Sequence, residues 1–145
     1  MKLYLAGPMR GYADFNFPSF KVAAAELRGM GHEVFSPAEK DIEHHGEAMF
    51  KSPDGDQKTL ERKTAFNLRD ALGMDLAWIC GHADGIALLK GWEKSAGACA
   101  ESATAKALGL KRYIQVVYSE VLDDKEWAEI DADGRPTGYV LLPLH

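Results

Sequence analysis

Short apolar runs alternate with stretches of helical periodicity along the first 117 residues of the chain. Residues 3–6 form an apolar run that ends at Gly7-Pro8, which predicts a buried strand. Pro18 is suited to open a helix, because the first helical turn does not need its missing N–H. A second short strand at residues 32–35 completes a strand–helix–strand opening. The core-facing positions of the helix recur at helical spacing, at Phe20, Ala23, Ala24, Leu27 and Met30.

The same alternation continues to the fourth expected strand. Residues 38–57 are polar and irregular, which predicts a surface loop over the site, with room for a short helical piece. A helical pattern over about residues 60–80 is followed by a strand at 83–89, a helix over 97–108 and a strand at 113–117. The expected fold class is therefore α/β, a Rossmann-like parallel sheet of four or five strands with helices on both faces.

The tail, residues 119–145, has a different pattern. Two extended stretches at residues 127–130 and 139–142 flank an Asp133-Gly134 turn, which predicts an antiparallel β-hairpin. This hairpin would either extend the sheet or cover a partner subunit, and its apolar residues 139–142 are the candidate contact of an expected homo-oligomer, a dimer or larger.

The chain length of 145 residues fits one domain, with a core over residues 1–118 and the hairpin as an extension. The formal net charge of −5 argues against a surface that binds a nucleic-acid duplex, although a local pocket can still attract a small anion. Two cysteines make no disulfide framework, and neither a signal peptide nor a membrane-spanning run is evident. We therefore expect a cytoplasmic protein with no membrane contact.

Two glycine-containing turns are candidate anion sites. In a parallel α/β sheet, ligands bind beyond the carboxyl ends of the strands, and both turns follow expected strands. In the Gly7–Gly11 turn, backbone amides can approach an anion and Arg10 adds a planar, charged donor. Residues 91–97 supply two glycines, a lysine and a serine just before a helix. The alternatives are a tight turn with a solvated Arg10, and an ordinary helix cap.

Asp75 and Glu101 are the candidate acid pair. Glu101 lies near the start of the helix expected over 97–108, and Asp75 lies at the foot of the preceding helix, so the two acids are on adjacent expected elements. Two carboxyl groups beside the anomeric carbon of a sugar supply a nucleophile and a proton donor. The alternative is that Asp75 forms a salt bridge and Glu101 is a solvated residue of the first helical turn.

Aromatic residues after the first strand are candidates for stacking on a base, although they can equally pack under the loop. They are Tyr12, Phe15 and Phe17, with Trp92 in the second turn as a further candidate. The five histidines show no metal-ligand spacing, so we expect neither a metal ion nor an organic cofactor.

Three motifs, in this order and spacing, resemble those of the nucleoside 2-deoxyribosyltransferase superfamily, which includes 2'-deoxynucleoside 5'-monophosphate N-glycosidases. They are residues 4–9 (YLAGPM), 75–78 (DLAW) and 97–101 (GACAE), the last followed by ALG at 107–109. The resemblance covers residues 3 to about 117 and is greatest to a largely phage-associated branch, so the chain is expected to be phage-encoded.

The resemblance implies roles for individual residues. Glu101 matches the glutamate that attacks the anomeric carbon, Tyr4 matches a tyrosine that orients it, and Asp75 matches the acid that handles the leaving base. Ser95 matches the position at which nucleotide-cleaving members place a serine on the 5'-phosphate and nucleoside transferases place an aspartate on the 5'-hydroxyl. Arg10 and Gly11 match the Arg-Gly of the phosphate loop in the nucleotide-cleaving members. The expected substrate or phosphate site as a whole is formed by Gly7, Met9, Arg10, Gly11, Ser95 and Gly97.

A hydroxyl group and Arg10 attract a dianionic phosphate, which an aspartate at position 95 would repel. The expected function is therefore hydrolysis of the N-glycosidic bond of a (2'-deoxy)nucleoside 5'-monophosphate, which releases the free base and a sugar phosphate. Transfer of deoxyribose between the bases of unphosphorylated nucleosides is the alternative within catalysis. A nucleotide-sensing module without catalysis and a purely structural protein are the alternatives of other classes.

Overall fold

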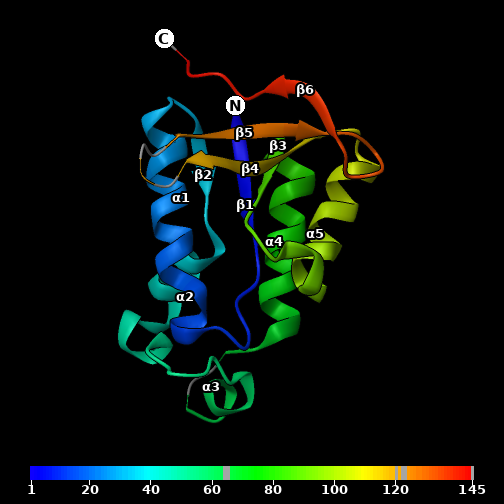
Figure 1. Ribbon diagram of the computed structural model, residues 1–145. Helices are drawn as coiled ribbons and strands as arrows, with labels where there is room; N and C mark the ends of the chain where they lie inside the picture. The colour runs from blue at the N-terminus through cyan, green and yellow to red at the C-terminus, as the bar shows by residue number, and fades with distance from the viewer. Residues whose placement is uncertain (64–65, 120, 122–123, 145) are drawn as a thin grey trace.

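The computed structural model describes residues 1–63, 66–119, 121 and 124–144. One mixed sheet contains the six described strands in the order β2-β1-β3-β4-β5-β6 (Figure 1). The first four strands are parallel to one another, whereas β5 and β6 are antiparallel to their neighbours. The strands are β1 (Lys2–Ala6), β2 (Glu33–Phe35), β3 (Gly85–Leu88), β4 (Lys111–Ser119), β5 (Asp124–Ile130) and β6 (Pro136–Val140).

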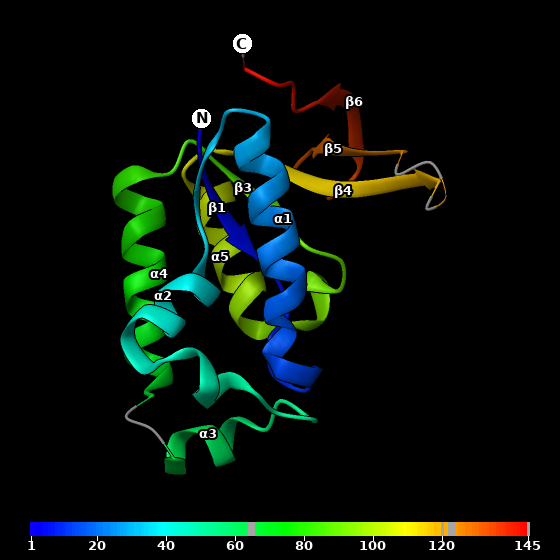
Figure 2. The same ribbon diagram turned by 90° about the vertical axis from the view of Figure 1, so that its left-hand side faces the viewer.

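Helices cover both faces of the sheet, as Figure 2 shows from the side. Helix α1 (Phe17–Gly29) packs on the face that carries Leu3 and Leu5, whereas α4 (Leu68–His82) and α5 (Ala96–Ala107) pack on the opposite face. Because side chains alternate along a strand, Tyr4 and Ala6 point toward α4 and α5. This alternation places the Tyr4 side chain on the same side as the acid residues of those two helices.

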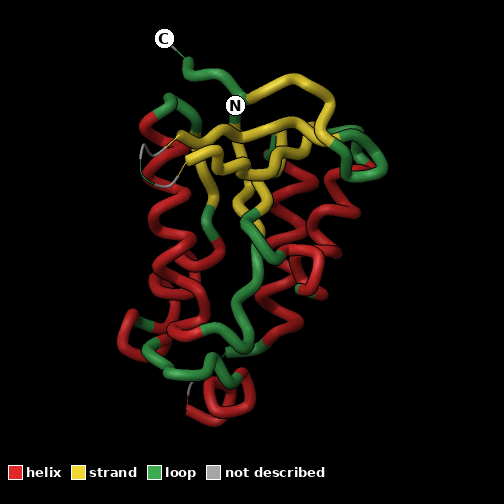
Figure 3. Tube along the Cα trace, viewed as in Figure 1, coloured by secondary structure: helices red, strands yellow, loops and turns green. Residues whose placement is uncertain are grey.

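A group of short helices lies beyond the carboxyl ends of the parallel strands (Figure 3). It contains α2 (Pro37–His45), α3 (Gln57–Lys63) and the 3₁₀ turn η2 (Glu47–Phe50). The expectation of a surface loop over 38–57 is therefore wrong for most of that segment. Pro37 occupies the first turn of α2 and favours a helix start there despite the polar composition.

The helix expected over residues 60–80 is instead two helices, α3 and α4. Asn67 caps α4, because its side-chain oxygen accepts a hydrogen bond from the backbone N–H of Asp70 at 3.2 Å. The cap begins a new helix within the apolar pattern. As a result, Asp75 lies in the middle of α4 rather than at its foot.

The α/β class, the four parallel strands and the C-terminal hairpin are confirmed. Strands β5 and β6 pair at Ile130 and Pro136, and β5 also pairs along β4, so the hairpin extends the sheet. The helices 17–29 and 96–107 agree with expectation to within one or two residues. None of the helices in the described part of the chain combines the length and the apolar character that crossing a membrane requires.

Candidate active site

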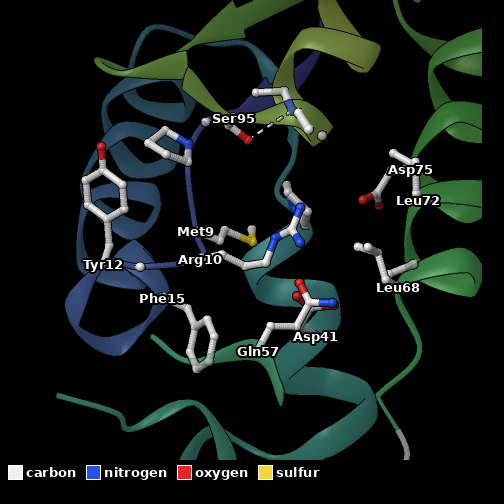
Figure 4. A pocket seen from close by; sticks show the side chains of 18 of the residues that line it. Met9, Arg10, Tyr12, Phe15, Asp41, Gln57, Leu68, Leu72, Asp75 and Ser95 are labelled. Carbon is white, nitrogen blue, oxygen red and sulfur yellow. Dashed lines mark hydrogen bonds between the residues drawn. The ribbon is translucent and has the colours of Figure 1, made fainter. Parts of the chain in front are cut away.

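A pocket of about 520 Å³ lies beyond the carboxyl ends of the parallel strands. Its walls come from the turn after β1, helices α2, α3 and α4, and the start of α5 (Figure 4). This volume falls within the range of pockets that hold a small ligand or cofactor. The position is the one at which open α/β sheets bind their ligands.

Tyr4 and Glu101 form the buried centre of the site. The Tyr4 hydroxyl donates a hydrogen bond to Oε2 of Glu101, which lies in the second turn of α5. Tyr4 is completely buried on β1, and Glu101 is only 6 % exposed at the pocket wall. The tyrosine therefore fixes the orientation of the one carboxyl group that reaches the pocket from α5.

Asp75 lines the same pocket from α4 (Figure 4). Burial raises its pKa to about 6, and hydrogen bonding by Tyr4 opposes this rise. Burial is also the main reason that the pKa of Glu101 rises to about 8; the Tyr4 hydrogen bond lowers it, and the charge of Asp75 raises it. The pKa of Tyr4 is raised well above its usual value by burial and by these two carboxyl groups. Near neutral pH the two acids thus hold a proton between them.

The turn after β1 forms the second side of the pocket. Gly7, Met9, Arg10 and Gly11 all line it, and the Arg10 side chain projects into it (Figure 4). A Cβ on Gly7 would lie 2.7 Å from Cβ of Leu89, the residue after β3, so only glycine fits at this position of the turn. Arg10 is exposed, and it makes no ion pair with any residue of the described ranges. Its guanidinium group is available to an anionic ligand.

The start of α5 faces Arg10 across the pocket. Ser95 caps the helix, with Oγ accepting from the backbone N–H of Ala98 at 3.2 Å, so the expected alternative of an ordinary cap is realised. The hydroxyl proton of Ser95 is not used by this cap and can still be donated to a ligand. Ser95 and Gly97 both line the pocket, at the helix end whose field favours negative charge.

The aromatic residues after β1 pack under the loop and also line the pocket, and stacking on a base stays a prediction. Tyr12, Phe15 and Phe17 line the pocket, and the last two also pack beneath it. Phe17 stacks on Phe50 with ring centroids 4.8 Å apart. Trp92 is a wrong assignment, because it does not line the pocket and instead packs against the core between the sheet and α5. Trp92 begins the short turn η3 (Trp92–Lys94).

Sequence reasoning missed Asp41 and Gln57, two polar residues that line the pocket from α2 and α3. Burial, with a smaller contribution from the charge of Asp75, raises the pKa of Asp41 to about 7. The Ser36-Pro37 dipeptide was the available signal, since a helix that begins there directs one face of α2 back toward the sheet.

A strap of residues 52–56 holds the turn after β1 in place. Gly11 donates its backbone N–H to the carbonyl of Gly55 at 3.1 Å, and Asp14 donates to the carbonyl of Ser52 at 2.6 Å. In return, the backbone N–H of Ser52 donates to Oδ1 of Asp14 at 2.8 Å. The anion-facing turn and the short helices are thus fixed to each other.

We expect Gly55→Ala to destabilise this strap. Gly55 has a φ of +64°, and a Cβ there would collide with the backbone oxygen of Tyr12. The strain and the collision together are expected to lower the free energy of unfolding by roughly 2–3 kcal/mol. Gly109→Ala is the matched control, because Gly109 has a φ of +71° but open space around it. Thermal denaturation of both variants measures the difference, and equal losses would contradict the proposed contact.

The match to known families covers the elements that build this pocket. A family model described as a domain of unknown function, DUF4406, matches residues 1–114. The chain belongs to the DUF4406 family. No curated protein and no solved structure matches the chain.

The DUF4406 match includes the four parallel strands as far as the middle of β4, and it ends before the hairpin of β5 and β6. All the pocket residues therefore lie within the DUF4406 segment. Within the described ranges, no three His, Cys, Asp or Glu side chains are grouped so that they could hold a metal ion.

Proposed function

We propose that this protein hydrolyses the N-glycosidic bond of nucleoside 5'-monophosphates. The observation that carries the proposal is the arrangement of one pocket: a buried Glu101 held by Tyr4, a second acid at Asp75, and an unpaired Arg10 beside a helix N-terminus. A sugar phosphate fits this arrangement, because its phosphate matches the cationic side and its anomeric carbon matches the acid side. The resemblance to nucleoside 2-deoxyribosyltransferases supports the same chemistry.

In the proposed reaction, the Glu101 carboxylate attacks C1' of the sugar as the bond from C1' to the base nitrogen breaks. Asp75 gives its proton to the departing base, which leaves as a neutral molecule. Water then attacks C1' of the glycosyl-enzyme, its proton passes to Asp75, and the Glu101 carboxylate is released. The products are the free base and the sugar 5-phosphate, and both acids return to their starting states.

The proton for the base is already present in the free enzyme. With pKa values of about 8 and 6, it resides mainly on Glu101, whereas the reaction needs it on Asp75. Moving it to Asp75 costs free energy, because Glu101 has the higher pKa of the two carboxyl groups. Tyr4 interacts with both carboxyl groups and is the natural path for the transfer.

Arg10→Ala tests the phosphate side of the proposal. We expect kcat/KM for a nucleoside monophosphate to fall by about tenfold to a hundredfold, the scale of a lost hydrogen bond to a charged group. The value for the unphosphorylated nucleoside is expected to remain within about twofold, since no phosphate is present to contact Arg10. Arg69→Ala is the control, because Arg69 is exposed on α4 and does not line the pocket.

Chromatographic separation of liberated base from nucleotide measures both activities. Preference of the unmodified enzyme for the nucleoside would contradict the phosphate site. Exchange of an added base into new nucleotide would show that a base, rather than water, captures the glycosyl-enzyme. Tight binding with no product after long incubation would favour a sensing module and contradict hydrolysis.

A further inference from the structure

Asp41 is a pocket carboxyl group that the proposed reaction does not use. It projects from α2 into the pocket (Figure 4), and Gln57 lines the same pocket from α3. Burial is the main cause of its raised pKa, and no hydrogen bond from a described residue compensates for the lost hydration. An acid that is desolvated at a pocket wall and has no partner in the protein is suited to pair with a ligand.

Burial, more than the charges around it, leaves Asp41 neutral in part at neutral pH. Asp75, on α4, is the neighbour whose charge raises the pKa of Asp41, which reaches about 7. A protonated carboxyl group offers one donor and one acceptor, whereas the ionised form offers acceptors alone. The other charged side chains that line the pocket are Arg10 from the β1 turn, Lys94 from η3 and Glu101 from α5.

The neighbouring charged groups on α2 are committed elsewhere. Glu39 pairs with Arg28 at 2.6 Å, and Lys40 pairs with Glu43 at 3.2 Å. The His45 ring packs against the rings of Phe50 and Phe66. Asp41 is thus the α2 group that is open to the pocket.

Gln57 adds a second polar side chain to the pocket that Asp41 lines. Its Nε2 donates to Oε1 of Glu61 at 2.7 Å, which leaves the amide oxygen for a ligand. The coupling between Asp41 and Asp75 also locates the base, because Asp75 is the acid that protonates the departing base. A base that leaves from Asp75 extends toward the wall that carries Asp41 and Gln57.

We propose that Asp41 and Gln57 read the edge of the base and select bases that carry an amino group beside a ring nitrogen, as adenine and cytosine do. The protonated Asp41 donates to the ring nitrogen and accepts one N–H of the amino group, and the Gln57 oxygen accepts the other. This inference rests on the proposed function, since it takes the pocket to hold a nucleotide.

The corresponding oxo bases fit this wall less well. Hypoxanthine and uracil present a carbonyl oxygen where adenine and cytosine present the amino group. Asp41 can still pair with the adjacent N–H, but the Gln57 oxygen then faces another acceptor and remains unsatisfied. Discrimination by an unpaired buried polar group is the general means by which such sites reject a close analogue.

The experiment measures binding without turnover. The dissociation constants of 2'-deoxyadenosine and 2'-deoxyinosine 5'-monophosphate are determined by calorimetry on the Glu101→Gln protein from pH 5.5 to 8.5. At pH 6 we expect the amino base to bind at least about tenfold more tightly, equivalent to one net hydrogen bond. The ratio is expected to fall with a midpoint near pH 7 as Asp41 ionises. Taking the ratio cancels the titration of the phosphate and of Asp75.

Two variants in the same background separate recognition from structure. Asp41→Asn keeps a donor and an acceptor, so the preference should persist at every pH and lose its pH dependence. Asp41→Ala removes both, so the ratio should fall to within about twofold of unity. Glu43→Gln is the control, because Glu43 is exposed on the same helix and pairs with Lys40. An unchanged preference in Asp41→Ala, or no preference in the parent, would overturn the inference.

Failure of this inference can be told from failure of the proposed hydrolysis. If binding is selective and depends on Asp41 but the protein never releases base, the proposed hydrolysis is rejected and the selection of the base by Asp41 and Gln57 is supported. If the unmodified protein hydrolyses nucleotides but Asp41→Ala leaves the ratio of the two dissociation constants equal to that of the parent, only the selection of the base by Asp41 and Gln57 is rejected. Absence of binding by both nucleotides would reject the base selection, whereas base release by the unmodified protein tests the hydrolysis separately.

Discussion

The Glu101→Gln protein is expected to fold and to release base at least about a thousandfold more slowly than the unmodified protein, the scale on which the loss of a covalent nucleophile is felt. Glutamine has nearly the same shape as glutamate, and its carbonyl oxygen can accept the hydrogen bond from Tyr4. The buried geometry is therefore retained while the nucleophilic oxygen is lost. A large loss of kcat with intact folding would tie the reaction to this one atom.

The measurement compares base release under saturating nucleotide with the thermal unfolding of the same preparations. Glu93→Gln makes the identical chemical change at an exposed position on η3, outside the pocket. This control is expected to keep full activity. Turnover by Glu101→Gln within tenfold of the unmodified rate would remove Glu101 from the role of nucleophile, because the carboxylate oxygen that the proposed reaction needs is absent from the variant.

The parts of the fold that could be predicted from sequence are those where one residue pattern permits one local structure. Residues 3–6 are continuously apolar because β1 is covered by helices on both faces. The stripe that includes Phe20 and Leu27 marks the buried face of α1. The turn at Gly134 produces the hairpin of β5 and β6. Each of these signals is local, so no knowledge of tertiary packing was needed.

The errors occur where tertiary contacts override local composition. Residues 38–57 are polar because α2 and α3 cover a pocket rather than a continuous core, and polarity was taken as a sign of a loop. Asp41 was missed for the same reason. The direction of the Trp92 side chain depends on the course of a three-residue turn, which no periodic pattern encodes.

The candidate site was predictable in part. The rule that ligands bind beyond the carboxyl ends of parallel strands predicts that the β1 turn and residues 91–97 meet at one edge, and residues of both line one pocket with Asp75 and Glu101. The role of Tyr4 came from resemblance, and the structure adds its hydrogen bond to Glu101. The pKa values of the acids could not be predicted, because they depend on how deeply each carboxyl group is buried.

Glu101 should also make the protein less stable at alkaline pH. Its pKa is about 8 when folded and near 4.5 in the unfolded chain, so between these values the folded protein binds more protons than the unfolded protein does. The stability that this proton uptake contributes is complete below pH 4.5 and is lost as the pH rises toward 8. Asp75 and Asp41, with pKa values of about 6 and 7, act in the same direction.

Glu101→Gln removes one of these titrating groups, so its stabilising effect should appear only at high pH. At pH 5 the side chain at position 101 is essentially neutral in both folded proteins, glutamate or glutamine. The melting temperatures of the unmodified protein and of Glu101→Gln should therefore nearly coincide. At pH 8.5 the variant should be more stable by up to about 5 kcal/mol, the equivalent of the shift in pKa from 4.5 to about 8, or at most roughly 10–20 °C in melting temperature. Thermal unfolding of both proteins and of Glu93→Gln across this pH range measures the effect. An equal shift at pH 5 and pH 8.5 would mean that the Glu101 side chain is not protonated in the folded protein, in which case the shared proton that the proposed reaction delivers to the base would have to come from elsewhere.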